Sequence, residues 1–248
     1  MYEHYPLNLS LEESQIKVVI PILLSLFCFI LYWFVAKSSK IKNFYYRQSK
    51  KASVKHIFFT KYFGFISMGL IPILFLSIFT SNFSFKSYGL VFLSETSSFS
   101  LIWIIGLSIV TIPIVTISAR KSKNLVNYPQ IRELKWNRKI LFLNLFGWAI
   151  YLFGYELLFR GVLLFPLFEE LGLWPAIAIN VALYSATHIP KGLDETIGAI
   201  PLGFVLCILT LQSGTIWIAF IVHVVMAWTN SLTALKHHPD INYVKNET

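Results

Sequence analysis

The chain has 248 residues, of which 56% are hydrophobic, 17% aromatic and only 13% charged. This composition excludes an ordinary soluble domain and indicates an all-α membrane protein, a bundle of about seven to eight transmembrane helices. The formal net charge is +9, but the basic residues cluster between apolar runs, a pattern typical of membrane topology. We therefore expect membrane lipids as partners and no nucleic acid.

Cysteine spacing and the amino-terminal sequence narrow the class further. Cys28 and Cys207 both lie inside apolar runs, so a disulfide framework is not expected and no metal-binding spacing is present. The first 17 residues are polar and net acidic, without the basic region that opens a cleavable signal peptide. The first apolar run is therefore expected to stay in the membrane.

The first half of the chain alternates apolar runs with basic segments. Its apolar runs, at 18–36, 62–80 and 101–118, are long enough to span a bilayer. The segment 37–61 carries eight Lys or Arg and no acid, and 119–139 carries seven with one Glu. Because cytoplasmic loops are rich in Lys and Arg, both segments are expected in the cytoplasm and the amino terminus outside. A dedicated anionic-lipid site in 37–61 is the alternative interpretation.

The second half holds the remaining apolar runs, at 140–168, 174–187, 196–211 and 215–235. The run at 174–187 is short for a full crossing. We divide the chain into a three-span region (1–139), a core (140–235) that holds almost all the intramembrane polar residues, and a polar cytoplasmic tail (236–248). The predicted location is a prokaryotic inner (plasma) membrane, crossed several times.

The core contains YELLFRG at 155–161, deep inside an apolar run. Glu156 and Arg160 lie four residues apart and share one face of a helix. From a helical rise of about 1.5 Å per residue, Glu156 lies roughly 15 Å from the outer surface, His188 roughly 21 Å and His223 roughly 12 Å. Three helices thus place ionisable groups in one slab of the bilayer, which predicts a shared polar cavity and favours a functional site.

Each residue also has a purely structural interpretation. Glu156 and Arg160 can neutralise each other as an ion pair, with Asn180 or a backbone carbonyl completing their hydrogen bonds. His223 alone is more simply a hydrogen-bonded packing residue, and His188 alone an interfacial one. Asn230, two turns after His223, either orients that histidine or bridges two helices.

The combination of residue types indicates a chemistry. A carboxylate and an imidazole around one water can hydrolyse an amide, with the carboxylate as general base and the imidazole as second base or oxyanion stabiliser. The Gly-x-Ser-x-Gly and His-Glu-x-x-His patterns are not present in the sequence. Metal ligation by Glu and His is conceivable in ligand type. The spacing does not demand it, so no cofactor is predicted.

Four strings in order resemble the CAAX protease and bacteriocin-processing (CPBP, or Abi) family: YELLFRG, YSATH at 184–188, HIPKGLDE from His188, and HVVMAW from His223. That family carries Glu-Glu-x-x-x-Arg, aromatic-x-x-x-His and last-span His-x-x-x-Asn/Asp motifs. The resemblance implies an all-α bundle of about eight spans and glutamate-type intramembrane proteolysis without an essential metal. It also implies substrates such as prenylated CAAX tails, or bacteriocin leader peptides in bacteria.

Most of the family's motif residues have a counterpart in this chain, and two do not. The counterparts are Glu156 (second Glu), Arg160, Tyr184 (aromatic position), His188 and His223. Tyr155 stands where the first Glu is expected, the residue that the resemblance makes the water activator. Ala227 stands at the Asn/Asp position, and Asn230, one turn later, is the candidate replacement.

Three functions remain open on the sequence. The first is a membrane endopeptidase in which Glu156 and His188 activate water, His223 stabilises the oxyanion and Arg160 positions Glu156. The second is a non-proteolytic family member, an immunity or scaffold protein, which Tyr155 favours. The third is a proton-coupled or polyprenyl-linked transporter, because Glu and His relays also serve pumps. The transporter ranks last, since the sequence shows no inverted repeats.

Overall fold

The computed structural model describes residues 10, 12–48, 51–80 and 83–245, and it confirms the predicted all-α membrane fold. Residues 1–9 and 11 of the predicted polar amino-terminal tail, and the last three residues of the predicted carboxy-terminal tail, lie outside the described residues. In chain order the elements are α1 Glu13–Lys37, α2 Ser39–Gln48, α3 Ala52–Phe65, η1 Ile66–Leu70, α4 Ile71–Phe79, η2 Phe85–Tyr88, η3 Ser94–Thr96, α5 Ser97–Ala119, α6 Ser122–Leu125, β1 Lys135–Trp136, α7 Arg138–Glu156, η4 Leu157–Leu164, α8 Phe165–Leu171, α9 Leu173–Ala186, η5 Ile189–Lys191, α10 Leu193–Ser213, α11 Trp217–His237 and β2 Asn242–Tyr243.

Six helical segments of the described chain are long and apolar enough to cross a membrane. They are Glu13–Lys37, Ala52–Phe79, Ser94–Ala119, Arg138–Leu171, Leu193–Ser213 and Trp217–His237. α9 has 14 residues, so it extends only about 21 Å, less than the roughly 30 Å of a hydrocarbon core. Together with α9 these segments correspond to the seven predicted apolar runs.

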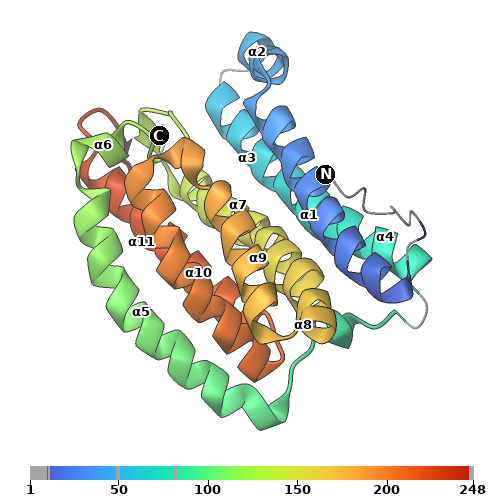
Figure 1. Ribbon diagram of the computed structural model, residues 1–248. Helices are drawn as coiled ribbons and strands as arrows, with labels where there is room; N and C mark the ends of the chain where they lie inside the picture. Colours follow the sequence, from blue (N-terminus) through green and yellow to red (C-terminus); the bar gives the residue numbers. More distant parts are fainter. Residues whose placement is uncertain (1–9, 11, 49–50, 81–82, 246–248) are drawn as a thin grey trace, which may run out of the picture.

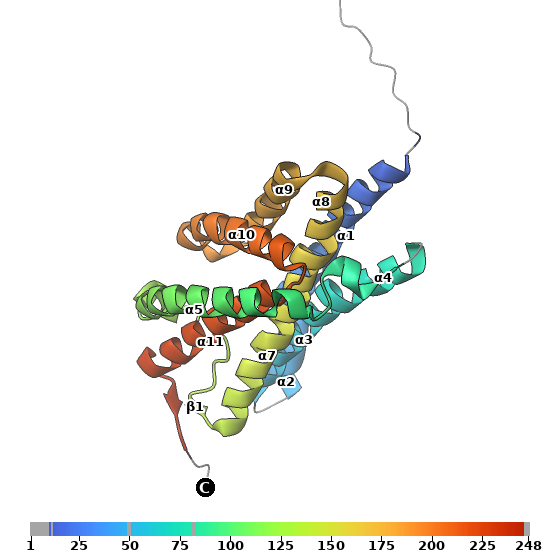
Figure 2. The ribbon, with the colours of Figure 1, turned by 90° about the horizontal axis from the view of Figure 1, so that it is seen from below.

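The helices flank one long central segment that runs from α7 through η4 into α8 (Figure 1). α3 and α11 both pack against α7, while α1 packs against α8. α5 lies along α11, and α10 pairs with α9 (Figures 1 and 2). The amino-terminal helices therefore do not form a separate body: they enclose the carboxy-terminal helices on two sides.

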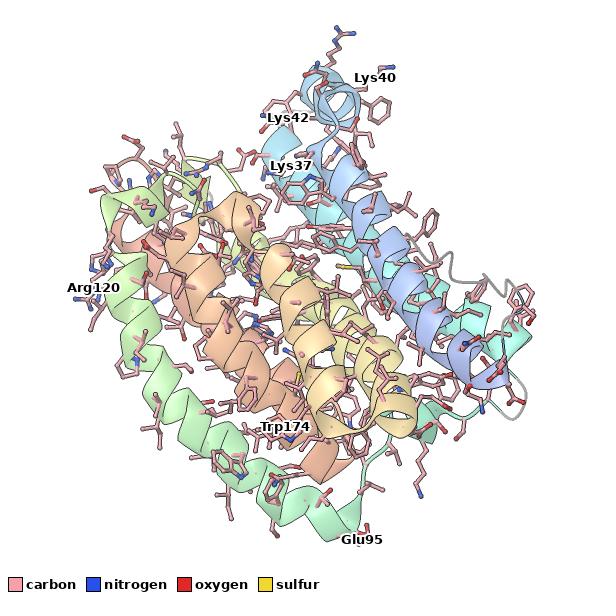
Figure 3. All side chains as sticks on the ribbon, in the orientation of Figure 1. Lys37, Lys40, Lys42, Glu95, Arg120 and Trp174 are labelled. Atoms are coloured by element: carbon pink, nitrogen blue, oxygen red, sulfur yellow. The ribbon has the colours of Figure 1, made fainter. Side chains whose placement is uncertain are left out.

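The basic segments meet at one end of the bundle. Lys37, Lys40, Lys42 and Arg120 lie at that end, and Glu95 and Trp174 lie toward the other (Figure 3). β1 and β2 form a short parallel pair, with Lys135 opposite Asn242 and Trp136 opposite Tyr243. The two predicted basic segments thus share one side of the bundle, which we refer to as the basic end.

The basic segment 37–61 is not the continuous loop that was predicted. It contains α2 and the first ten residues of the second long helix, which begins at Ala52 instead of Tyr62. Lys61 is only 4% exposed and lies inside the bundle. Its positive charge predicts a position in a cytoplasmic loop. In the structure its ammonium instead packs over the ring of Trp148, a residue far away in sequence.

The central segment changes its helical geometry at the YELLFRG motif. η4 is a π-helix that begins directly after Glu156, and a second π-helix, η1, interrupts the neighbouring span. A Cβ on Gly154 would lie 2.9 Å from the Cα of Phe65, so the two backbones are in direct contact here. π-helical turns occur frequently at functional sites, and this one directs Arg160 into the bundle.

Candidate functional site

Glu156 and Arg160 form an ion pair in the interior of the bundle. Both side chains have no exposed surface, and Nε of Arg160 donates to Oε2 of Glu156 at 3.1 Å. A charged pair is expensive to bury, and only further hydrogen bonds make the burial tolerable. The contact expected from the four-residue spacing is therefore present, although the backbone after Glu156 is π-helical.

Arg160 has polar partners on two other helices. Its Nη1 donates to Oδ1 of Asn180 on α9, and to Sγ of Cys207 on α10 at 3.2 Å. Its guanidinium carbon lies 4.7 Å from the ring centroid of Tyr184. Asn180 donates in turn to the carbonyl of Phe159. These contacts fix the guanidinium and join α9 and α10 to the central segment.

His223, on α11, uses both of its ring nitrogens. Nδ1 donates to Oε1 of Glu156, and Nε2 lies 3.0 Å from the hydroxyl of Tyr184. The His223 side chain is 12% exposed, whereas the Glu156 side chain is fully buried. Glu156 is thus bonded through both oxygens, to Arg160 and to His223, so its carboxylate holds other protein groups in place.

His188 follows the end of α9 and is half-buried. Its Nδ1 lies 3.0 Å from the carbonyl oxygen of Tyr184, and its ring centroid lies 4.9 Å from that of Tyr184. Within the described ranges its Nε2 has no hydrogen-bond partner. Burial, aided by the charge of Lys191, lowers the pKa of this imidazole below its ordinary value. His188 is therefore a neutral, oriented imidazole with a free basic nitrogen.

Tyr155 stands between the two histidines. Its ring centroid lies 6.5 Å from that of His188 and 6.2 Å from that of His223. Its hydroxyl lies 2.8 Å from Oγ1 of Thr187, and the single hydrogen of that threonine is directed to the carbonyl of Tyr184 at 2.7 Å. Tyr155 must therefore be the donor to Thr187. The family resemblance places a carboxylate at this position. In this chain the position holds a phenol, and its hydroxyl hydrogen is already donated to Thr187.

Asn230 is not brought into this cluster. It has no hydrogen bond to His223 in the described part of the chain. The adjacent Ser231 instead accepts a hydrogen bond from Asn144 at 2.8 Å, in a buried bridge between α11 and α7. Ala227 packs among the apolar side chains around Trp148. Asn230, the candidate replacement for the family's last polar residue, is therefore not bonded to the cluster among the described residues.

The sequence interpretation missed two parts of the cluster. One is the link through Thr187, which joins Tyr155 to Tyr184 and His188. The other is Cys207, which donates to Asn180 at 3.2 Å. Neither residue could be identified from the sequence, because no spacing pattern includes the threonine directly before His188 or the cysteine in its apolar run. In the region that the structure describes, no group of three His, Cys, Asp or Glu side chains is arranged to hold a metal ion.

The polar groups form one chain of contacts from Arg160 through Glu156 and His223 to Tyr184, and then to His188. Residues 137–229 match the family model described as Rce1-like, type II CAAX prenyl endopeptidase Rce1-like. This segment is similar to that family. The match confirms the family resemblance, overlaps the predicted core and ends one residue before Asn230. No curated protein and no solved structure matches the chain.

Proposed function

We propose that the chain is a membrane endopeptidase of the CAAX type, in which His188 is the base that activates water. The observation that carries this proposal is the state of the His188 imidazole. Its Nδ1 is held by the Tyr184 carbonyl, which leaves Nε2 free to accept a proton. The half-buried position of His188 gives a water or a peptide access to that nitrogen. The Rce1-like match supports a peptidase as the reaction class.

The proposed reaction uses His188 twice. Nε2 takes a proton from a water molecule, and the water oxygen attacks the carbonyl carbon of the peptide bond. The carbonyl oxygen becomes the oxyanion of a tetrahedral intermediate. When the C–N bond breaks, the imidazolium of His188 returns its proton to the departing amine. Water is thus divided between the new carboxyl and amino termini.

Tyr184 is the proposed donor to the oxyanion. Nδ1 of His223 donates to Glu156, and its Nε2 lies 3.0 Å from the Tyr184 hydroxyl. In the proposed reaction the hydroxyl hydrogen of Tyr184 turns from Nε2 toward the substrate oxygen as negative charge develops there. In this scheme Glu156 and Arg160 are positioning residues, because they hold His223 and do not contact the reacting atoms.

A specific observation favours a second candidate, a non-proteolytic family member that binds a peptide or a membrane partner. Tyr155 replaces the carboxylate expected beside His188, and a phenol is a poor base at neutral pH. The one carboxylate of the cluster, on Glu156, has no exposed surface and is already bonded through both oxygens. The same cluster would then act as a rigid recognition surface.

One experiment distinguishes the two candidates. Purified protein in liposomes is incubated with an S-farnesylated peptide and with a mixed peptide library, and new termini are identified by mass spectrometry. The peptidase proposal expects cleavage by the wild type and a loss of about 10²-fold or more in His188→Gln. Cleavage only after Tyr155→Glu restores a carboxylate would support the non-proteolytic candidate for the natural chain. Cleavage that is unchanged in His188→Gln would refute the role of His188.

A further inference from the structure

A short helix, α2, lies across the end of the bundle between the first two long helices. α1 ends at Lys37, and the next residue, Ser38, has an extended backbone with ψ of 116°. The Ser38 hydroxyl accepts a hydrogen bond from the backbone N–H of Ile41 at 3.4 Å, which caps the first turn of α2. Figure 1 shows α2 end-on, whereas α1 and α3 run lengthwise beside it. Because the candidate span ends at Lys37, α2 lies where lipid headgroups meet the hydrocarbon.

The aromatic face of α2 is packed against α3. The ring centroid of Tyr45 lies 6.0 Å from that of His56 and 5.6 Å from that of Phe59. Tyr46 adds a second ring, 6.4 Å from His56. Ile41 and Tyr45, one helical turn apart, are both half-buried. Since this face is held by the bundle, the opposite face of α2 has a fixed orientation.

The opposite face of α2 carries an open pocket of about 380 Å³. We call it the pocket face, and it is formed by Lys40, Asn43, Phe44 and Arg47. Steps of three and four residues place these side chains on one side of a helix, and all four are exposed. The Phe44 side chain lies between the two cations in sequence and is 55% exposed. Cations and an exposed aromatic ring on one face are typical of helices that lie at a membrane surface.

The cations of α2 lack negative partners within the protein. Among the described residues, Lys40, Lys42 and Arg47 form no salt bridge with a carboxylate. The whole segment 37–61 contains no acidic residue. Phosphate oxygens suit ammonium and guanidinium donors, and an acyl chain suits a phenyl ring. A soluble phosphate would leave the Phe44 ring in water, so charge and apolar surface together favour a lipid.

We propose that the pocket face binds one anionic phospholipid from the leaflet at the basic end. Lys40 and Arg47 donate to the phosphate oxygens. Asn43 donates to an ester oxygen, and the Phe44 ring packs against the first methylene groups of an acyl chain. None of these residues belongs to the histidine cluster, so lipid binding does not depend on the proposed peptidase reaction. The competing explanation is a diffuse topological charge, which requires neither a fixed helix nor an exposed ring among the cations.

The test measures the first lipid that binds to the purified full chain. Native mass spectrometry in detergent, with added phosphatidylglycerol or phosphatidylcholine, gives the dissociation constants. Each cation near an anionic headgroup contributes about 5-fold, so Lys40→Gln/Arg47→Gln should weaken phosphatidylglycerol binding about 25-fold. Phe44→Ala should weaken it about 3- to 10-fold with no change of charge. The matched control Arg120→Gln removes a cation from the same end of the bundle, on α5 and away from α2 (Figure 3), and should change it less than about 2-fold.

The same titrations contain the results that would overturn the site. Phosphatidylcholine binding should be unchanged in Lys40→Gln/Arg47→Gln, and an equal loss of both lipids would mean that the pocket face does not recognise the phosphate charge. A loss in Arg120→Gln as large as that in Lys40→Gln alone would assign the binding to diffuse charge. Full affinity in Phe44→Ala, together with competition by inorganic phosphate as strong as that by the lipid, would assign the pocket face to a soluble anion. Equal affinities of the wild type for the two lipids would also refute the proposal.

Discussion

Removing the Arg160 charge tests whether the polar cluster is one interdependent unit. Arg160→Met keeps most of the apolar stem and deletes the guanidinium that contacts Glu156, Asn180 and Cys207. Because Glu156 has no exposed surface, the substitution leaves a buried carboxylate whose remaining hydrogen-bond partner among the described residues is His223. Breaking a buried pair in this way costs about 3–5 kcal/mol. We expect a decrease of that size in the free energy of unfolding.

The double variant Arg160→Met/Glu156→Gln separates the charge effect from the packing effect. Removing both charges avoids the uncompensated carboxylate, so the double variant should be more stable than Arg160→Met alone by about 1–3 kcal/mol. Unfolding is measured in bicelles by titration with sodium dodecyl sulfate and followed by circular dichroism. Lys17→Met is the matched control, because the ion pair between Lys17 and Glu13, at 3.0 Å, is exposed and should change stability far less than the buried pair does.

Two results would refute this reasoning. The first is an Arg160→Met variant within about 1 kcal/mol of the wild type, which would mean that the carboxylate is hydrated or protonated instead of paired. The second is a double variant whose loss equals the sum of the two single losses, since independent sites add and coupled ones do not. Either result would remove the support that Arg160 is proposed to give to His223 through Glu156.

Three further predictions follow from other parts of the structure. Gly154→Ala should destabilise the fold by about 1–3 kcal/mol, because the new Cβ would lie 2.9 Å from the Cα of Phe65. The control Gly106→Ala should be neutral or stabilising, because no atom lies within 4 Å of the new Cβ. Equal melting temperatures of the two variants would contradict the close contact at Gly154. Since burial lowers the pKa of His188, the imidazole stays neutral at a pH where an ordinary histidine gains a proton. We therefore expect kcat/KM to be constant from about pH 7.5 to about 5.5, and a half-maximal point near pH 6.5 would show that the pKa of the base is not lowered. If the basic end lies in the cytoplasm as predicted, a cysteine that replaces Lys40 should not be labelled by a membrane-impermeant maleimide in intact cells. A cysteine that replaces Ser94 should be labelled. The opposite labelling pattern would show that the orientation is the reverse of the predicted one.

The membrane helices were the easiest part to predict from the sequence. Bilayer thickness sets the length of a spanning helix, so apolar runs located them to within a few residues in most cases. The exception is the second span, because the basic residues that precede its apolar run predict a loop there. Lys61 is buried because Trp148 and Tyr151 cover its ammonium, and that pairing depends on the packing of α3 against α7. A local sequence pattern does not reveal a contact between helices that lie so far apart in the chain.

Spacing and depth identified most residues of the polar cluster, but they did not predict how these residues are connected. Four-residue spacing predicted the contact of Glu156 with Arg160, and helical rise placed His223 at a similar depth. The hydroxyl of Tyr184 on His223 and the carbonyl of Tyr184 on His188 depend on rotamers and on where α9 ends. Asn230 illustrates the limit of spacing, since a residue two turns from His223 turned out to be separate from the cluster.

Tyr155 determines how much catalysis the cluster can supply. A general base commonly contributes about 10²–10⁴-fold to a rate, and an adjacent carboxylate strengthens an imidazole base by stabilising its protonated form. At this site the group beside His188 is a phenol that donates to Thr187, so in the proposed reaction His188 acts without that carboxylate. The proposed peptidase should therefore be slow, because His188 lacks a neighbouring carboxylate that would stabilise its protonated form.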